Sequence, residues 1–343
     1  MKSITEAGDL KGKKVIVRVD WNEPVENYRV LSDYRIKKSF PTIEYLEKAG
    51  AKVILISHRE GEENSLEPAF KHAKTFLPNL TFKEDGPIML LENLRQNSGE
   101  MANSLDYAKE LSGLGEIYVN EAFSESHRNY ASIVGIPKFL PSYAGLRLSI
   151  EVQELSKTFY PKHPFLFILG GAKFDTKLPL VKKFLNIADF VFVGGALANN
   201  FFKEQGKDVD GSLVSDGEFG LLELLKTGKV LLPEDTITKE GKILDAGPKT
   251  LEMLKEKIAA SKLVLWNGPL GNYENGFTVA TKELAKMIAD AGHESIIGGG
   301  DTLAAIEELQ LLDKFTFVST GGGAMLDFLA MGTLPGIEAL SKK

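Results

Sequence analysis

Residues 165–184 read FLFILGGAKFDTKLPLVKKF, and this stretch contains an apolar run, a glycine turn and an amphipathic segment in succession. The run Phe165–Leu169 predicts a buried strand, the two glycines predict a turn, and the apolar spacing in Leu178–Phe184 predicts a helix. Further apolar runs alternate with helical patterns along the chain: Val15–Val19, Val53–Ile56, Ile88–Leu91, Ile117–Val119, Phe190–Val193, Leu263–Trp266, Ile296–Ile297 and Phe315–Val318. This alternation predicts an α/β protein whose parallel sheets are covered by helices on both faces.

The length of the chain indicates more than one such sheet. At about 150 residues per domain, a chain of 343 residues predicts two domains. The helical pattern in 147–161 predicts a hinge helix with Ile150, Val152 and Leu155 on its apolar side, so we place the domains at 1–150 and 151–327. The expected fold is two doubly wound parallel-sheet, Rossmann-like domains joined by that helix, with about four to six strands each.

Arginine is distributed unevenly between the two halves. All seven arginines lie in the first 147 residues: Arg18, Arg29, Arg35, Arg59, Arg95, Arg128 and Arg147. Arginine binds carboxylate and phosphate in a bidentate fork, whereas glycine at strand-to-helix turns lets backbone N–H groups approach phosphates. The distribution predicts a small anion on the first domain and a nucleotide on the second, although compositional drift from arginine to lysine would give the same pattern.

Composition excludes several classes of protein. The formal net charge of −6 disfavours a general nucleic-acid-binding protein, which needs a basic face. The absence of cysteine excludes disulfides, thiolate metal sites and a cysteine nucleophile. No run reaches the roughly 18 apolar residues of a membrane-spanning helix, and the N-terminal MKSITEAGDLKGKK lacks the apolar run of a signal peptide. We therefore expect a cytoplasmic protein with no nucleic-acid or membrane partner.

Glycine clusters follow the apolar runs of the second half, at 170–171, 194–195, 298–300 and 321–323. Ligands bind beyond the carboxyl ends of strands in open α/β sheets, so these turns predict an anion site; tight turns or close packing are the alternative. None of the clusters matches the dinucleotide fingerprint or the P-loop. Asp301 and Thr302 open a helix, where an aspartate either caps the helix or holds Mg²⁺ beside phosphates. Lys173 and Lys177, four residues apart, would meet phosphate together.

Polar residues also follow the strands of the first half. Asp20 and Asn22 flank Trp21 at the tip of the first strand, where either a binding site or an Asp-x-Asn turn is expected. Arg35 begins a helix, where the helix dipole disfavours a cation, so its position indicates a bound anion. His58 and Arg128 also follow apolar runs, but the spacing of the histidines is poor for a metal site.

A series of segments in the same order resembles the phosphoglycerate kinase family, nearly from end to end of the chain. The segments include VIVRVDWNEPV (15–25), ILGGAKFDTK (168–177), LWNGPLGNYE (265–274), IIGGGDT (296–302) and VSTGGGAMLDFL (318–329). The resemblance implies reversible phosphoryl transfer between 1,3-bisphosphoglycerate and ADP, giving 3-phosphoglycerate and ATP with Mg²⁺, as a step of glycolysis. It also implies a monomer whose C-terminal segment 328–343 packs back on the first domain.

By this resemblance each domain carries half of the site. The first domain would bind the triose phosphate through Asp20, Trp21, Asn22, Arg35, His58, Arg59, Arg95 and Arg128. The second would bind the nucleotide through Lys173, Lys177, Gly194, Gly195, Glu274, Gly299, Gly300, Asp301 and Thr302, with Glu274 at the ribose hydroxyls and Asp301 at the metal. A hinge closure would bring the two halves together.

The chemistry of the implied reaction needs no general base, because the accepting carboxylate is already ionised at neutral pH. Catalysis would come from positioning and from cations around the transferring group. We expect Arg35 and Lys173 to supply the charge, assisted by the N–H groups of Gly321–Gly323, with Gly322 at their centre.

One loop of the first half departs from the family. Where the family has Ser-His-Leu-Gly-Arg-Pro, this chain has Ser57-His58-Arg59-Glu60-Gly61-Glu62, with Gly61 in place of the arginine. Either Arg59 substitutes for it from a shifted position, or the loop arginine has no replacement. The chain is also shorter than the usual member, with most of the loss expected in the first domain. A nucleotide-binding scaffold with weak or lost turnover therefore remains an alternative, while the lack of a GxGxxG fingerprint disfavours a dehydrogenase on the same fold.

Overall fold

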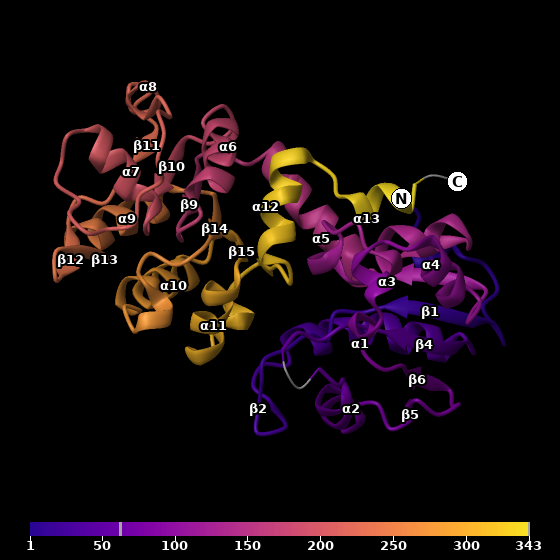
Figure 1. Ribbon diagram of the computed structural model, residues 1–343. Coiled ribbons are helices and arrows are strands. Elements are labelled where there is room, and N and C mark those ends of the chain that lie inside the picture. The colour runs from indigo at the N-terminus through magenta and orange to yellow at the C-terminus, as the bar shows by residue number, and fades with distance from the viewer. Residues whose placement is uncertain (62–63, 342–343) are drawn as a thin grey trace. The chain divides into compact units, whose positions relative to one another are not determined.

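The computed structural model describes residues 1–61 and 64–341, so Glu62 of the divergent loop and Lys342 and Lys343 of the C-terminal segment lie outside the described residues. The contacts within the chain divide it into two units. Unit 1 is Met1–Gln153 together with Met331–Lys343, and unit 2 is Glu154–Ala330. Each unit is built on one sheet with helices around it (Figure 1).

The sheet of unit 1 has six parallel strands. Their order is β5 (Leu80–Phe82), β6 (Ile88–Leu90), β4 (Lys52–Ile56), β1 (Lys14–Arg18), β7 (Ile117–Asn120) and β8 (Ser142–Ala144). The chain passes from β1 to β4 on one side and returns later to β7 on the other, so the strand order reverses beside β1. Ligands of doubly wound sheets bind at the carboxyl ends of the strands at such a reversal.

The helices of unit 1 are α1 (Tyr34–Lys48), α2 (Glu67–Lys74), α3 (Ser98–Met101), α4 (Leu105–Ser112), α5 (Leu146–Ser156) and α13 (Pro335–Ala339). A small hairpin, β2 (Val25–Glu26) and β3 (Arg29–Val30), follows β1. Helix α5 spans the division between the units. The prediction that Ile150 lies on its apolar side is wrong, because this side chain is 45% exposed, whereas Leu155 is fully buried.

The C-terminal segment packs on unit 1. The N–H of Gly336 in α13 donates to the carbonyl of Ser126 at 2.8 Å, and the side chain of Leu334 is fully buried. A Cβ at Gly336 would lie 2.9 Å from the side chain of Ile133 and 3.0 Å from the backbone of Ser126. This close approach requires glycine at position 336, so the C-terminal segment packs tightly against unit 1 and forms a part of its core.

The sheet of unit 2 repeats the arrangement. Its parallel strands are ordered β11 (Val230–Leu231), β10 (Phe190–Val193), β9 (Phe165–Leu169), β14 (Leu263–Asn267), β15 (Glu294–Gly298) and β16 (Phe317–Val318), so the order reverses between β9 and β14. The helices are α6 (Phe174–Phe184), α7 (Leu197–Glu204), α8 (Leu221–Leu225), α9 (Pro248–Ala260), α10 (Val279–Ala291), α11 (Gly300–Glu308) and α12 (Gly322–Met331). An antiparallel hairpin, β12 (Thr236–Lys239) and β13 (Lys242–Ala246), completes the unit.

Each unit contains one of the two tryptophans, and both are fully buried. The indole N–H of Trp21 donates to Ser39 Oγ at 3.0 Å, and that of Trp266 donates to the carbonyl of Gly268 at 2.8 Å. Both residues stand at or just beyond the end of a central strand, so they anchor the loops that follow β1 and β14.

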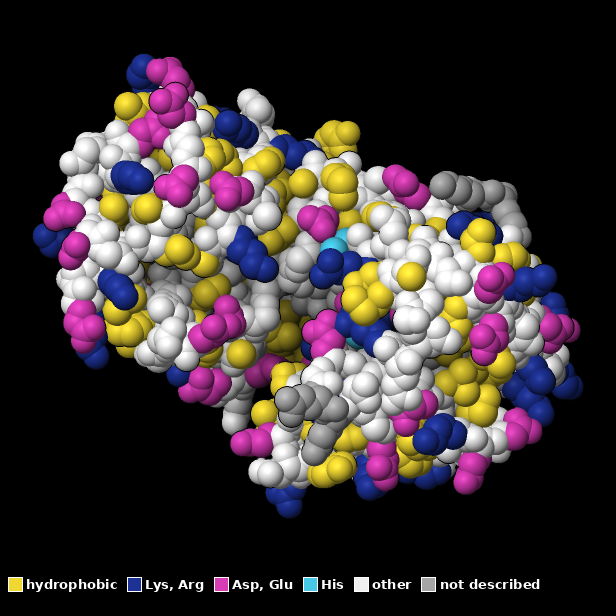
Figure 2. Space-filling view, viewed as in Figure 1, with side chains coloured by type: hydrophobic (Ala, Val, Ile, Leu, Met, Phe, Trp, Pro, Cys, Tyr) yellow, Lys and Arg dark blue, Asp and Glu magenta, His cyan; other side chains and the backbone are white. Residues whose placement is uncertain are grey.

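The predicted fold class, two doubly wound parallel sheets, is confirmed. In the described residues no helix is long and apolar enough to cross a membrane. On the face that Figure 2 shows, Lys and Arg side chains are interspersed with Asp and Glu side chains.

Candidate active site

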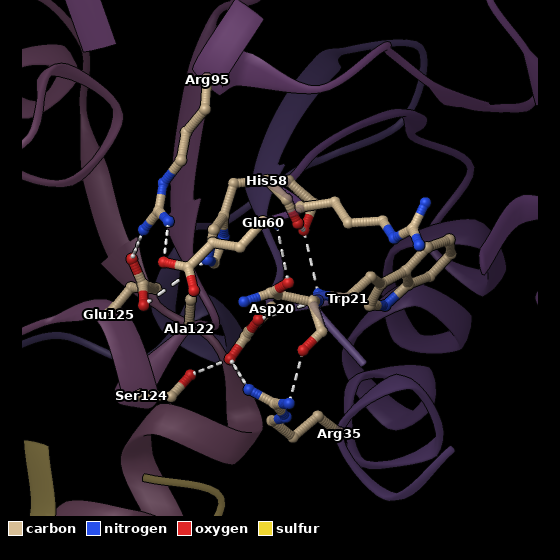
Figure 3. A network of polar contacts seen from close by, with 12 residues as sticks. Asp20, Trp21, Arg35, His58, Glu60, Arg95, Ala122, Ser124 and Glu125 are labelled. Atoms are coloured by element: carbon tan, nitrogen blue, oxygen red, sulfur yellow. Dashed lines mark hydrogen bonds and ion pairs between the residues drawn. The ribbon is translucent and has the colours of Figure 1, made fainter. Parts of the chain in front are cut away.

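Asp20 and Arg35 form the centre of a polar cluster in unit 1 (Figure 3). Asp20 follows β1 and is buried, and Arg35 is the second residue of α1. Arg35 Nη1 donates to Asp20 Oδ2 at 2.9 Å, and the hydroxyl of Ser124 donates to the same oxygen. Burial raises the pKa of Asp20, but the Arg35 cation, the nearby His58 and the hydrogen bonds from Ser124 and Asn22 together lower it by more, so this pKa lies well below its usual value. The aspartate is therefore ionised and fixed at neutral pH.

Glu23 holds Arg35 from the other side. Its Oε2 accepts from Arg35 Nη2 at 2.9 Å and from Nε at 3.2 Å, and its Oε1 accepts from the Arg35 backbone N–H at 2.7 Å. Burial raises the pKa of Glu23, although the Arg35 cation opposes this rise. The cation at the N-terminus of α1 is thus matched by two carboxylates of the chain itself, which fix the direction of its guanidinium.

Arg95, His58 and Glu125 make a second cluster beside the first. Arg95 Nη2 donates to Glu125 Oε2 at 3.1 Å, and Arg95 Nη1 donates to Glu60 (Figure 3). His58 Nδ1 lies 3.1 Å from Arg18 Nη2, and its Nε2 lies 3.6 Å from Glu125 Oε1. Burial lowers the pKa of His58 well below its usual value, and the Arg18 cation lowers it further. His58 is therefore neutral at pH 7, and its Nδ1 accepts from Arg18.

The other residues predicted for the first half occupy different surroundings. The indole of Trp21 is in the core, and the hydroxyl of Ser57 accepts from its backbone N–H at 2.9 Å. Arg59 is buried, and its Nη1 donates to the carbonyl of Ser65 at 3.1 Å, so part of its guanidinium is engaged by its own loop. Arg128 is exposed, and its backbone N–H donates to the carbonyl of Glu125 at 2.9 Å. Asn22 Oδ1 accepts from the backbone N–H of Glu60 at 3.0 Å.

In unit 2 several glycine turns pack backbone against backbone. A Cβ at Gly170 would lie 2.2 Å from the carbonyl oxygen of Pro269, and one at Gly195 would lie 2.7 Å from the backbone nitrogen of Gly171. A Cβ at Gly194 would lie 2.7 Å from the ring of Phe192. These glycines are therefore required by close packing of the turns that follow β9, β10 and β14, whatever else they do.

The turn after β15 is different. Gly299 has φ +109°, a backbone conformation that favours glycine, and a Cβ at Gly300 would meet open space. Helix α12 begins beside this turn, because a Cβ at Gly322 would lie 3.4 Å from the Cα of Gly299. Backbone groups at Gly299, Gly300 and Gly322 thus converge at one edge of the sheet, as an anion site needs.

Two lysines lie at the start of α6. Lys173 is the exposed N-cap residue, and Lys177 is buried with its Nζ donating to the carbonyl of Gly170 at 2.6 Å. Burial lowers the pKa of Lys177 to about 8, with Lys173 lowering it further and Asp301 opposing the change. At neutral pH Lys177 is therefore still mainly a cation, but it loses its proton at a lower pH than an ordinary lysine does, and it lies within electrostatic range of both neighbours.

Asp301 is the second residue of α11, whose N-cap is Gly299, so the alternative reading of Asp301 as a helix cap is wrong. Burial raises the pKa of Asp301, and the carboxylate of Glu274 raises it further. Thr302 is fully buried, and its hydroxyl accepts from the backbone N–H of Gly268 at 3.1 Å, so it ties the turn after β14 to α11. Glu274 is exposed in a short 3₁₀ turn, Tyr273–Asn275.

Sequence reasoning missed the carboxylates that pair with the arginines of unit 1. Glu23, Glu60 and Glu125 come from three separate segments, and only the fold brings them to Arg35 and Arg95. One signal was present: Arg18 directly follows the three buried apolar residues of β1, and a buried arginine requires an acidic or polar partner nearby.

The chain has two reversals of strand order, one in each unit. Paired arginines and carboxylates lie at the first, and glycine turns and lysines lie at the second. This arrangement defines a two-domain α/β protein of the phosphotransferase class. The family model named phosphoglycerate kinase matches residues 4–331. The chain belongs to the phosphoglycerate kinase family.

Relatives match along nearly their whole length. The chain is 37% identical over 384 residues to phosphoglycerate kinase of Dictyoglomus turgidum, covering 98% of this chain and 97% of the relative. It is 39% identical over 388 residues to that of Thermosipho africanus, covering 98% and 96%. Both alignments are longer than the 343 residues of this chain, so the relatives contain residues without a counterpart here.

Solved structures agree with these matches. Phosphoglycerate kinase from Coxiella burnetii superposes with a TM-score of 0.83 at 32% identity, and that from Pyrococcus horikoshii OT3 with 0.85 at 28% identity. Each match covers 99% of this chain and 98% of the other.

Proposed function

We propose that the protein catalyses reversible transfer of a phosphoryl group between 1,3-bisphosphoglycerate and ADP, giving 3-phosphoglycerate and ATP. The observation that carries the proposal is the family match, which extends over nearly the whole chain and nearly the whole of each relative. The two sets of residues at the strand-order reversals support it, since one set is rich in arginine and the other in glycine and lysine. A glycolytic role, a cytoplasmic location and a monomeric state belong to the same proposal.

In this proposal unit 1 binds the triose phosphate. Arg35 is the residue best prepared to stabilise the transferring group, because Asp20 and Glu23 fix its guanidinium before any ligand arrives. A preorganised cation stabilises developing charge without reorganising during the reaction. Asn22, His58, Arg95 and Arg128 would position the rest of the substrate, and Trp21 would act by holding the loop rather than by touching the ligand.

Unit 2 would bind the nucleotide. Lys173 and Lys177 would meet its phosphates, assisted by the backbone N–H groups of Gly299, Gly300 and Gly322. Glu274, exposed on its 3₁₀ turn, would accept hydrogen bonds from the ribose hydroxyls. The acceptor of the phosphoryl group is an ionised carboxylate, so the residues of this chain need only orient the two ligands and supply positive charge.

The residues present fit a magnesium ion. The pKa of Asp301 is raised by burial and by the charge of Glu274, and a nearby divalent cation would relieve both effects. No group of three or more acidic or histidine side chains that could hold a metal occurs in the described part of the chain. Mg²⁺ commonly uses one or two carboxylates together with nucleotide phosphates, so Asp301 would hold it with the nucleotide, where it neutralises phosphate charge.

The test is the formation of ATP from 1,3-bisphosphoglycerate and ADP by the full chain, measured with a coupled assay. We expect steady turnover that requires both substrates. A chain that binds ADP but forms no ATP would instead support the nucleotide-binding scaffold. The observation that favours this second candidate is that Arg35 and Arg95 are already paired with carboxylates of the chain itself. Size-exclusion chromatography with light scattering tests the monomeric state.

A further inference from the structure

Arg95 has its guanidinium held by two carboxylates of the chain. Nη1 donates to Glu60 and Nη2 donates to Glu125 (Figure 3). The ring centre of Tyr130 lies 5.5 Å from the guanidinium carbon. The Arg95 side chain is only 12% exposed. Its buried Nε has no hydrogen-bond partner among the described residues. A buried donor without a partner costs free energy, so this site is incomplete without a further acceptor.

The two carboxylates differ in how easily they can leave. Glu125 is 12% exposed and also faces His58 and Arg18, so moving it would leave several buried groups unpaired. The Glu60 side chain is 67% exposed on the loop after β4, and the backbone N–H of Glu60 is held separately from its carboxylate, by a 3.0 Å hydrogen bond to Asn22 Oδ1. The Glu60 carboxylate can therefore turn into water while its backbone stays in place.

We propose that Glu60 is an internal competitor, whose carboxylate occupies Arg95 in the free enzyme and is displaced by the phosphate group of the substrate. This proposal rests on the function proposed above, and it assigns Glu60 a role in setting substrate affinity. Nη1 of Arg95 cannot donate a full-strength hydrogen bond to Glu60 and to a phosphate oxygen at the same time. Displacing an exposed carboxylate from an arginine costs little free energy, but the charge of the carboxylate stays near the site and opposes the binding of an anionic ligand.

The experiment compares Glu60→Gln and Glu60→Ala with the parent chain by calorimetric titration of 3-phosphoglycerate at low salt. Glutamine keeps the shape but removes the charge, so both variants should bind about threefold to tenfold more tightly, and added salt should shrink the difference. The matched control is Glu67→Gln, which removes the same charge from unit 1 at an exposed pair, Glu67 with Lys71 at 2.8 Å. The control should leave the affinity unchanged.

The sign of the effect separates this role from a structural one. If Glu60 merely positions Arg95, its removal weakens binding, and unchanged or weaker binding overturns the proposal. In an Arg95→Ala background the Glu60→Gln substitution should have a smaller effect, because the competition for Arg95 is gone and only the general repulsion of the anionic ligand remains. Titration with inorganic phosphate forms a separate arm. Tighter phosphate binding by Glu60→Gln, with no variant binding 3-phosphoglycerate, would support the role of Glu60 and overturn the proposed substrate.

Discussion

Replacing Arg35 by alanine removes the cation that the structure holds between Asp20 and Glu23. Since a preorganised arginine at a phosphoryl-transfer site contributes on the order of 10³-fold or more to turnover, we expect a loss of at least that size. ADP affinity should stay within about twofold of the parent, because the nucleotide residues of the proposal all belong to unit 2. The coupled assay measures the first quantity, and calorimetric titration with ADP measures the second.

The same substitution should lower the stability of unit 1. It leaves two buried carboxylates, 6% and 5% exposed, without the cation that makes four side-chain contacts to them and to their loop. Breaking a fully buried ion pair costs about 3–5 kcal/mol. Because the Arg35 side chain is 24% exposed and Asp20 keeps its bonds from Ser124 and Asn22, we expect about 2–3 kcal/mol.

The loss should depend on pH in a defined direction. In the parent chain the pKa of Asp20 lies below its usual value, since Arg35 and the other polar groups around it together outweigh burial. Asp20 therefore stabilises the fold above that usual value, and this contribution is lost as the pH falls further. Without Arg35 the largest of the effects that oppose burial is gone, and the pKa of Asp20 should rise. Both carboxylates then take up protons at mildly acidic pH, so the difference in unfolding free energy should be largest near pH 7 and shrink toward pH 5.

Urea unfolding at pH 7 and pH 5 measures this, with Trp21 fluorescence as the signal in a Trp266→Phe background shared by all variants. The matched control is Arg29→Ala, which removes an exposed arginine from hairpin β2–β3 of the same unit. Turnover above about a tenth of the parent value would refute the assigned role of Arg35. An equal loss of stability at both pH values would refute the electrostatic reasoning.

Three further predictions concern single residues. Asp301→Ala should weaken Mg-ADP binding by about tenfold or more with little change in melting temperature, because Asp301 is not a helix cap; calorimetric titration and a thermal melt would expose the opposite pattern. ADP affinity should fall as the pH rises through about 8, because the pKa of Lys177 lies there and its positive charge is lost above it. The Lys177→Met variant should bind ADP more weakly than the parent at neutral pH and should lack this pH dependence. A parent affinity that is constant from pH 7 to 9 would contradict the prediction. Gly61→Arg should tighten 3-phosphoglycerate binding by about tenfold, since a side chain there meets open space, although φ +105° will cost part of the gain; weaker binding in a titration would show that the loop follows another path.

The central strands could be predicted because they are buried on both faces and therefore form unbroken apolar runs. β9 and β14 are fully buried along their length, and the sequence pattern alone located them. The edge strands β5, β8 and β11 were not predicted, since they have two or three residues each and at most one fully buried side chain. Their pairing depends on a neighbouring strand and leaves little trace in the local sequence.

The candidate site could be predicted in its residue types but not in its pairing. Arg35 was conspicuous because a cation at a helix start is unfavourable, and the structure provides Glu23 and Asp20 as the matching anions. Glu60 meets Arg95 across 35 positions of sequence, and no local pattern announces such a contact. The glycine turns could be located from the sequence, because their glycines are clustered. The close backbone packing that requires glycine at Gly170 and Gly195 could not be predicted, since it depends on the neighbouring turns.

On the ribosome, unit 2 is complete before unit 1. The segment after Ala330 is made last, yet Leu334 is fully buried in unit 1 and Gly336 is bonded to Ser126 there. Domains generally fold as units in the order of synthesis, and here the unit that begins the chain must wait for its end. Nascent unit 1 therefore exposes the apolar surface that this segment will cover, for as long as residues 154–330 are being translated, and this is the period in which it most needs a chaperone.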